Sequence, residues 1–157
     1  MGKLRHDPMA MRPFIGYNVG DYFAHWLRIG AQAPQQTALP RIFLVNWFRR
    51  DADSGRYLWP GFGDNIRVLD WIAKRCANEA EGVDTPIGIL PGRGALNTAG
   101  LDISDEDMDA LFSIDQNQWF EEVERQRDAL RTCGDQVPDA LWIENRRLYM
   151  RLAAEQQ

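Results

Sequence analysis

The sequence has 157 residues, a net charge of -5 and a pI of about 5.0. This length suits one domain, and 45% hydrophobic residues can form a buried core, which excludes a disordered chain. The acidic balance argues against nucleic-acid binding, because nucleic-acid-binding surfaces are basic. No apolar run reaches the roughly 20 residues that span a bilayer, and MGKLRHDPMAMRPF has prolines and charges where a signal peptide is apolar. We therefore expect a soluble, cytoplasmic protein that binds neither nucleic acid nor membrane.

The first half of the chain predicts one helix and one strand. Residues 1–20 contain prolines and glycines that favour irregular structure. Asp21 can cap a helix that continues to about Gly30. The apolar run RIFLVNWF, Arg41–Phe48, is rich in β-branched and aromatic residues and predicts a strand buried on both faces. A charged turn, RRDADSGR, follows it.

The middle of the chain predicts a second helix and a second strand. Asp64 or Asn65 can cap a helix that continues to about Cys76 with apolar residues at helical spacing. TPIGILP, Thr85–Pro91, predicts a short strand, and a loop follows it. Cys76 and Cys133 lack the spacing of a metal site or a disulfide framework, so we expect two buried, reduced thiols.

The remainder of the chain is predicted to be helical. Ser104 and Asp107 form a start that resembles a capping box, and we interpret the carboxylates of SDEDMD as a solvated first turn. Asp115 can cap a longer helix that Gly134 ends, and a last helix begins near Pro138. Strands thus come early and helices late, which predicts a helix-rich α/β fold. Two isolated strands do not form a stable sheet, so the chain lacks strand partners.

One loop has an unusual composition. YLWPGFGDN, Tyr57–Asn65, combines three aromatic residues with a Pro-Gly turn and a second glycine. Aromatic rings bind a purine base by stacking, which contributes roughly 1–3 kcal/mol per base, and an amide such as that of Asn65 can bond the edge of the base. Aromatic residues near a Pro-Gly turn also serve as core residues, and Asn65 is equally suited to cap a helix. The spacing alone leaves these alternatives open.

Five motifs together resemble a known family. They are HDPMAMRPFIGYN (His6–Asn18), YFAHWL (Tyr22–Leu27), RIFLVNWFR (Arg41–Arg49), YLWPGFGDNIRVLDW (Tyr57–Trp71) and TPIGILP (Thr85–Pro91). In order and spacing they resemble the carboxy-terminal part of GTP-dependent phosphoenolpyruvate carboxykinase. The resemblance covers essentially the whole chain but only about the last quarter of the family's chain. It implies a fragment of the carboxy-terminal mononucleotide-binding domain.

The resemblance also implies an organisation and a set of site residues. Residues 1–157 would form one partial domain, with a guanine-binding segment at 41–75 and a helical tail at 104–157. In the family, two phenylalanines sandwich the guanine of GTP, a third aromatic ring lines the pocket and an asparagine contacts the base. Phe48 and Phe62 match the two sandwiching rings, and Asn65 matches the asparagine. Tyr57 stands where the family usually has phenylalanine, after a segment that is about one residue longer.

The family converts oxaloacetate and GTP to phosphoenolpyruvate, carbon dioxide and GDP in gluconeogenesis. It uses manganese, a second divalent ion such as magnesium, and a phosphate-binding loop with a lysine, all of which lie upstream of the part matched here. The only lysines of this sequence, Lys3 and Lys74, are not followed by the serine or threonine that such a loop needs. We interpret the only histidines, His6 and His25, as hinge, packing or structural residues, not metal ligands. We thus expect no catalytic or metal-binding residue in this chain.

Two hypotheses for function follow. In the first, the chain is part of a carboxykinase lyase, its partners are guanine nucleotide and the remainder of the carboxykinase chain, and the isolated chain is inactive. In the second, it is a stand-alone, non-catalytic guanine-nucleotide-binding or interaction domain derived from that enzyme. A module for proline-rich peptides fits poorly, because such modules are small β folds. A fragment should also expose apolar strand edges, for example along Arg41–Phe48, and should be marginally soluble or associate with itself.

Overall fold

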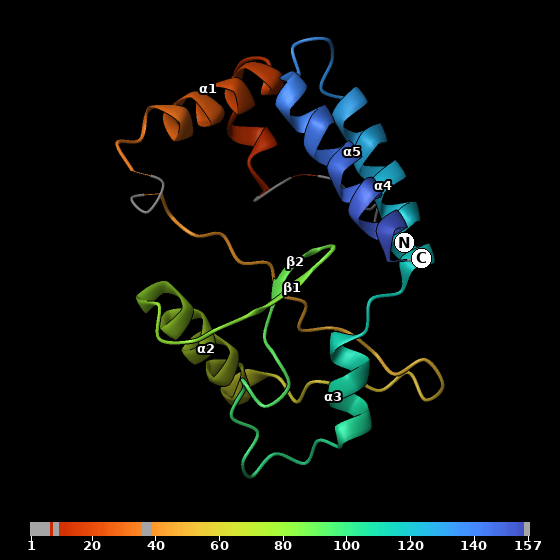
Figure 1. Ribbon diagram of the computed structural model, residues 1–157. Coiled ribbons are helices and arrows are strands. Elements are labelled where there is room, and N and C mark those ends of the chain that lie inside the picture. The colour runs from red at the N-terminus through yellow and green to blue at the C-terminus, as the bar shows by residue number, and fades with distance from the viewer. Residues whose placement is uncertain (1–6, 8–9, 36–38, 156–157) are drawn as a thin grey trace. The chain divides into compact units, whose positions relative to one another are not determined.

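The computed structural model describes residues 7, 10–35 and 39–155 (Figure 1). The chain is rich in helices, and its described residues form one two-stranded sheet. It divides into two compact units. We call Met1–Pro40 together with Asp115–Gln157 the helical unit, and Arg41–Ile114 the loop unit. The coarse prediction of a helix-rich mixed fold is confirmed. The division places the predicted guanine-binding segment in the loop unit and divides the predicted helical tail between the two units.

The helical unit begins with a short 3-10 helix, η2 (Arg12–Phe14), and the helix α1 (Val19–Gln32). The predicted cap of α1 was wrong by three residues, because Asn18 and not Asp21 caps the helix. The Asn18 side chain accepts a hydrogen bond of 2.7 Å from the backbone of Gly20. Asp21 instead lies in the first turn, where its charge favours the positive end of the helix dipole.

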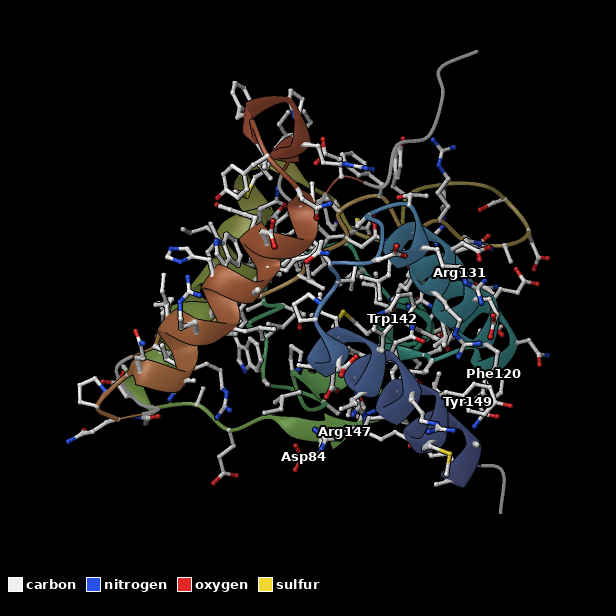
Figure 2. All side chains as sticks on the ribbon, turned by 90° about the horizontal axis from the view of Figure 1, so that it is seen from above. Asp84, Phe120, Arg131, Trp142, Arg147 and Tyr149 are labelled. Carbon is white, nitrogen blue, oxygen red and sulfur yellow. The ribbon has the colours of Figure 1, made fainter. Side chains whose placement is uncertain are left out.

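Helices α4 (Gln116–Arg131) and α5 (Asp139–Ala154) pack against each other in the same unit. Val123 of α4 and Leu152 of α5 are fully buried. Figure 2 shows Phe120 beside Tyr149, and their ring centroids are 5.1 Å apart. The predicted cap of α4 is confirmed, since the Asp115 side chain accepts a 3.0 Å hydrogen bond from the backbone of the first turn.

The loop unit contains η4 (Phe62–Asp64), α2 (Asn65–Ala77), β1 (Val83–Thr85), β2 (Gly88–Leu90) and α3 (Asp105–Phe112). The two strands pair antiparallel, with Val83 opposite Leu90. The strand predicted over Thr85–Pro91 is confirmed only at Gly88–Leu90, because the chain turns between Thr85 and Gly88 and Thr85 belongs to a separate strand. Gly88 adopts a φ of 128°, a backbone conformation that glycine reaches without a steric penalty.

The segment Arg41–Phe48 was predicted to be a strand buried on both faces, and this is wrong. No strand lies in it, and Ile42 and Leu44 are 77% and 98% exposed. Phe43 packs instead against Trp71 of α2, with ring centroids 6.2 Å apart. A strand needs a neighbour for its backbone hydrogen bonds, and none pairs with this segment among residues 39–155. The segment thus exposes apolar side chains, as expected, but not the strand edge that was predicted to carry them.

Three further sequence predictions concern cysteine, histidine and membrane insertion. Both cysteines are free, but Cys76 is exposed and Cys133 is half-buried, so the predicted burial is wrong. His25 is exposed on α1, and its Nδ1 lies 3.0 Å from Nη2 of Arg28, a surface contact and not core packing. His6 lies outside the described residues. Within the described part of the chain, no helix combines the length and apolar character needed to cross a membrane.

Candidate functional site

The loop Tyr57–Asn65 presents one ring far into solvent. Gly61 has a φ of 81°, and Phe62, which follows it, has a φ of 45°. Positive φ is uncommon for any residue with a side chain, and for a bulky one it indicates local strain. The Phe62 side chain is 95% exposed, and no ring contact joins it to another described aromatic residue. The loop therefore holds a large apolar ring outside the core at a conformational cost.

Phe48 and Tyr57 form a second exposed aromatic group. An isolated β-bridge between Arg50 and Tyr57 closes the charged turn, and the backbone of Leu58 donates a 3.0 Å hydrogen bond to Arg49. The bridge brings the rings of Phe48 and Tyr57 together edge to face, with centroids 6.2 Å apart. Phe48 is 72% exposed and Tyr57 is 50% exposed. The structure thus brings Phe48 and Tyr57, two of the four predicted site residues, into contact.

Arg50 covers one side of the Tyr57 ring. Its guanidinium carbon lies 4.2 Å from the ring centroid, and its Nη2 donates a 2.6 Å hydrogen bond to the tyrosine hydroxyl. Its Nη1 donates a further hydrogen bond, 3.2 Å long, to the carbonyl of Gly55. A cation stacked on an aromatic face is attracted by the negative charge of the ring. Arg50 therefore fixes the orientation of Tyr57.

Two other arginines fasten this turn to helix α3. Arg49 donates hydrogen bonds of 2.9 Å to the carbonyl of Leu111 and 3.0 Å to that of Ser113, and one of 2.8 Å to the Ser113 hydroxyl. The last carbonyls of a helix have no partner within the helix, and the end of the helix dipole attracts a cation. Arg56 pairs with Asp107 in the first turn of α3 at 2.5 Å. Helix α3 thus supports the segment that carries Phe48 and Tyr57.

The Arg56–Asp107 pair changes the electrostatics of α3. The hydrogen bond from Arg56 lowers the pKa of the Asp107 carboxyl below its ordinary value, although burial opposes this. The same hydrogen bond raises the pKa of Arg56. Asp107 is only 8% exposed, so the interpretation of the SDEDMD carboxylates as a solvated turn is wrong for this residue. The capping role of Ser104 is confirmed, since its hydroxyl accepts a 3.1 Å hydrogen bond from the backbone of Asp107.

Asn65 does not cap a helix with its side chain. It is the first residue of α2, the capping position belongs to Asp64, and no side-chain cap bond forms there. The Asn65 Oδ1 instead accepts a 3.0 Å hydrogen bond from Nε1 of Trp59. Trp59 and its neighbour Leu58 are 5% and 4% exposed. The middle of the aromatic loop is thus core, as one of the open interpretations expects, whereas Tyr57 and Phe62 at its two sides are exposed, and their binding to a base stays a prediction.

The described residues contain no group of three or more histidine, cysteine or acidic side chains that could hold a metal ion. They therefore do not fit the manganese and magnesium ions that the resemblance implies, and we derive no chemical step through a metal. The residues around the loop are aromatic, amide and guanidinium groups. Such groups stack on flat rings and bond their polar edges.

Comparison with known proteins identifies the family. The model of the phosphoenolpyruvate carboxykinase C-terminal P-loop domain matches residues 1–151. A relative from Renibacterium salmoninarum, named phosphoenolpyruvate carboxykinase [GTP], is 47% identical over 97% of this chain and 25% of its own length. Relatives of the same name from Neocallimastix frontalis and Thermoplasma volcanium are 47% and 48% identical, over 98% and 92% of this chain and 25% and 23% of their own lengths. This chain thus spans about a quarter of the length of these relatives, and it belongs to the GTP-dependent phosphoenolpyruvate carboxykinase family, of which it represents the carboxy-terminal part.

Proposed function

We propose that this chain supplies the guanine-binding wall of a GTP-dependent phosphoenolpyruvate carboxykinase. The complete enzyme would convert oxaloacetate and GTP to phosphoenolpyruvate, carbon dioxide and GDP. The relatives that carry GTP in their names support the nucleotide, and the exposed aromatic residues of the loop unit support the place where its base binds. Phe48, Tyr57, Phe62 and Asn65 are the proposed base-binding residues.

Phe62 provides the observation that carries the proposal. A non-glycine residue in the left-handed region costs of the order of 1–3 kcal/mol, and a ring that is 95% exposed gains almost nothing from burial in return. Stacking on a base contributes roughly 1–3 kcal/mol per base. A base ligand would thus offset the strain that the chain itself leaves uncompensated.

The remaining site residues have distinct roles in the proposal. Phe48 would provide the second stacking face, and Tyr57, held by Arg50, would line the side of the pocket. Asn65 would contact the polar edge of the base. Because the chain spans about a quarter of its relatives, we assign it base selection only. Binding of phosphates, metal ions and organic acid belongs, in this proposal, to the remainder of the carboxykinase chain, so the isolated chain is expected to be inactive.

The substitution Phe48→Ala tests the proposal in a carboxykinase that carries this 157-residue sequence as its carboxy-terminal quarter. Loss of one stacking face should raise the KM for GTP about 5- to 150-fold, the factor that corresponds to roughly 1–3 kcal/mol. The matched control is Leu44→Ala, which removes a side chain that is 98% exposed and lies four residues earlier. Its effect on the KM for GTP should be much smaller. An unchanged KM for GTP in the Phe48 variant would overturn the assignment of the site.

A further inference from the structure

We propose that Trp59 is a positioning residue that turns the amide of Asn65 so that its NH2 group faces the base. This inference rests on the proposed function, since it concerns how the same site distinguishes one purine from another. Its structural basis is the 3.0 Å hydrogen bond between Nε1 of Trp59 and Oδ1 of Asn65.

The hydrogen bond determines which end of the amide is available. An indole N–H can only donate, whereas an asparagine side chain has an acceptor oxygen on one side and an NH2 donor on the other. The Trp59 donor therefore selects the oxygen of Asn65, and the NH2 group is left for other partners. No hydrogen bond from this NH2 group to another described residue is formed. Asn65 thus keeps its oxygen on the side of Trp59 and directs its NH2 donor to the other side.

Both partners of this hydrogen bond are held in place. Trp59 is 5% exposed, so its indole ring is fixed by packing. The backbone N–H of Asn65 donates to the carbonyls of Phe62 and Gly63, which ties the residue to the short helix η4. Arg67, one turn along α2, bonds the Asp64 side chain at 3.1 Å. The amide of Asn65 is thus presented from a fixed backbone, three residues after the exposed Phe62.

A fixed donor distinguishes guanine from adenine. Guanine carries acceptors at O6 and N7, whereas adenine carries an NH2 donor where guanine has O6. A donor at the O6 position bonds guanine and meets another donor in adenine. If the amide were flipped, its oxygen would lie against O6 of guanine, which is also an acceptor, and no hydrogen bond could form. The same oxygen could accept a hydrogen bond from the NH2 group of adenine. In this proposal Trp59 does not touch the nucleotide but determines the direction of the preference.

The substitution Trp59→Phe removes the indole N–H and keeps an aromatic ring in the core. The readout is the ratio of the inhibition constants of ADP and GDP, measured in a carboxykinase that carries this sequence as its carboxy-terminal quarter. We expect the preference for GDP to fall about tenfold, the effect of losing one oriented hydrogen bond of roughly 1.4 kcal/mol. A preference that stays at the unsubstituted value in a folded variant would overturn the inference.

Trp71 provides a matched control for the loss of a buried indole. It is 4% exposed, and its Nε1 has no hydrogen-bond partner among the residues that the structure describes. Trp71→Phe thus makes the same chemical change in the same unit without touching the Asn65 amide. We expect its ratio of inhibition constants to match that of the unsubstituted enzyme. An equal loss of preference in both variants would show that any change to the core loosens the site, and would also overturn the positioning role of Trp59.

A double-substitution cycle with Asn65→Ala separates positioning from general stabilisation. If Trp59 acts through the amide, Trp59→Phe should change the preference in the presence of Asn65 and leave it unchanged in the Asn65→Ala background. Equal effects in both backgrounds would overturn the inference. An unsubstituted enzyme that binds GDP and ADP equally would overturn the proposed function itself, and so the two failures can be told apart.

Discussion

Replacing Phe62 by glycine should separate the stability of the loop from its function. The residue has a φ of 45° and is 95% exposed. An L-residue in this region is strained by about 1–2 kcal/mol, and glycine relieves the strain. Glycine also gives the unfolded chain more freedom, which destabilises the folded state by about 0.4–1 kcal/mol. Since almost no buried area is lost, the free energy of unfolding should change by between about zero and an increase of 1.5 kcal/mol.

The effect on the nucleotide should have the opposite sign. Phe62→Gly removes one of the two proposed stacking faces, so the KM for GTP should rise about 5- to 150-fold. Urea unfolding reports the stability of the carboxykinase that carries the sequence, and steady-state kinetics report the KM. The pair Phe62→Gly and Phe62→Ala forms an internal control, because alanine removes the ring but keeps the strained Cβ. Both should weaken GTP binding, and the alanine variant should be less stable by about 1 kcal/mol.

Two results for the glycine variant would contradict the proposed role of Phe62, one in the free energy of unfolding and one in the KM for GTP. A loss of stability greater than about 2 kcal/mol in the glycine variant would mean that the ring is packed like a core side chain. An unchanged KM for GTP in the same variant would remove the functional reason for the strain. Met150 on α5 is 62% exposed and belongs to the other unit, so it provides a control for the loss of an exposed apolar side chain outside the loop unit. Met150→Ala should leave the KM for GTP unchanged.

Two further predictions concern stability. The Arg56 guanidinium lowers the pKa of Asp107, so the ionised form stabilises the folded chain; this stabilisation is present above about pH 4, the ordinary aspartate pKa, and is lost as the pH falls through the lowered pKa. In the Asp107→Asn variant, the midpoint of unfolding should therefore decline less steeply as the pH falls below about 4. If the midpoint depended on pH as it does in the unsubstituted chain, the pairing of Arg56 with Asp107 would be contradicted. Gly20→Ala should destabilise the helical unit by more than about 1 kcal/mol, because the added Cβ would lie 2.5 Å from the backbone carbonyl of Gln136. A melting temperature equal to that of the unsubstituted chain would show that the backbones of Gly20 and Gln136 do not approach each other this closely.

Structural features that depend on neighbouring residues could be predicted from the sequence. The caps at Ser104 and Asp115 bond backbone groups only three residues away, so their chemistry is visible in a short window. The predicted start of α1 was wrong even though its cause is local. Asn18 and Asp21 both suit a capping position, and the spacing of the apolar residues did not distinguish them. Asn18 forms the cap in the structure.

Sequence reasoning failed where the partner is distant in the chain. The strand predicted over Arg41–Phe48 depended on a neighbouring strand, and its composition gave no sign that Ile42 and Leu44 would be exposed. Arg49 and Arg56 were missed as site-supporting residues. Their partners on α3 lie between 51 and 64 residues further along the chain. The one available signal was the presence of arginines beside aromatic residues, which often bond carbonyls or carboxylates.

The composition of the aromatic loop follows from a division of roles among its neighbours. Arg49 and Arg56 fasten the segment before the loop to α3, Arg50 holds Tyr57, and the buried Trp59 holds Asn65. Because these polar contacts come from outside the loop or from its buried centre, Phe62 needs no part in holding the fold. A side chain that carries no structural role can be exposed and strained without loss of stability elsewhere. In the proposed function, the exposed rings beside these fixed contacts provide the stacking faces for a flat base.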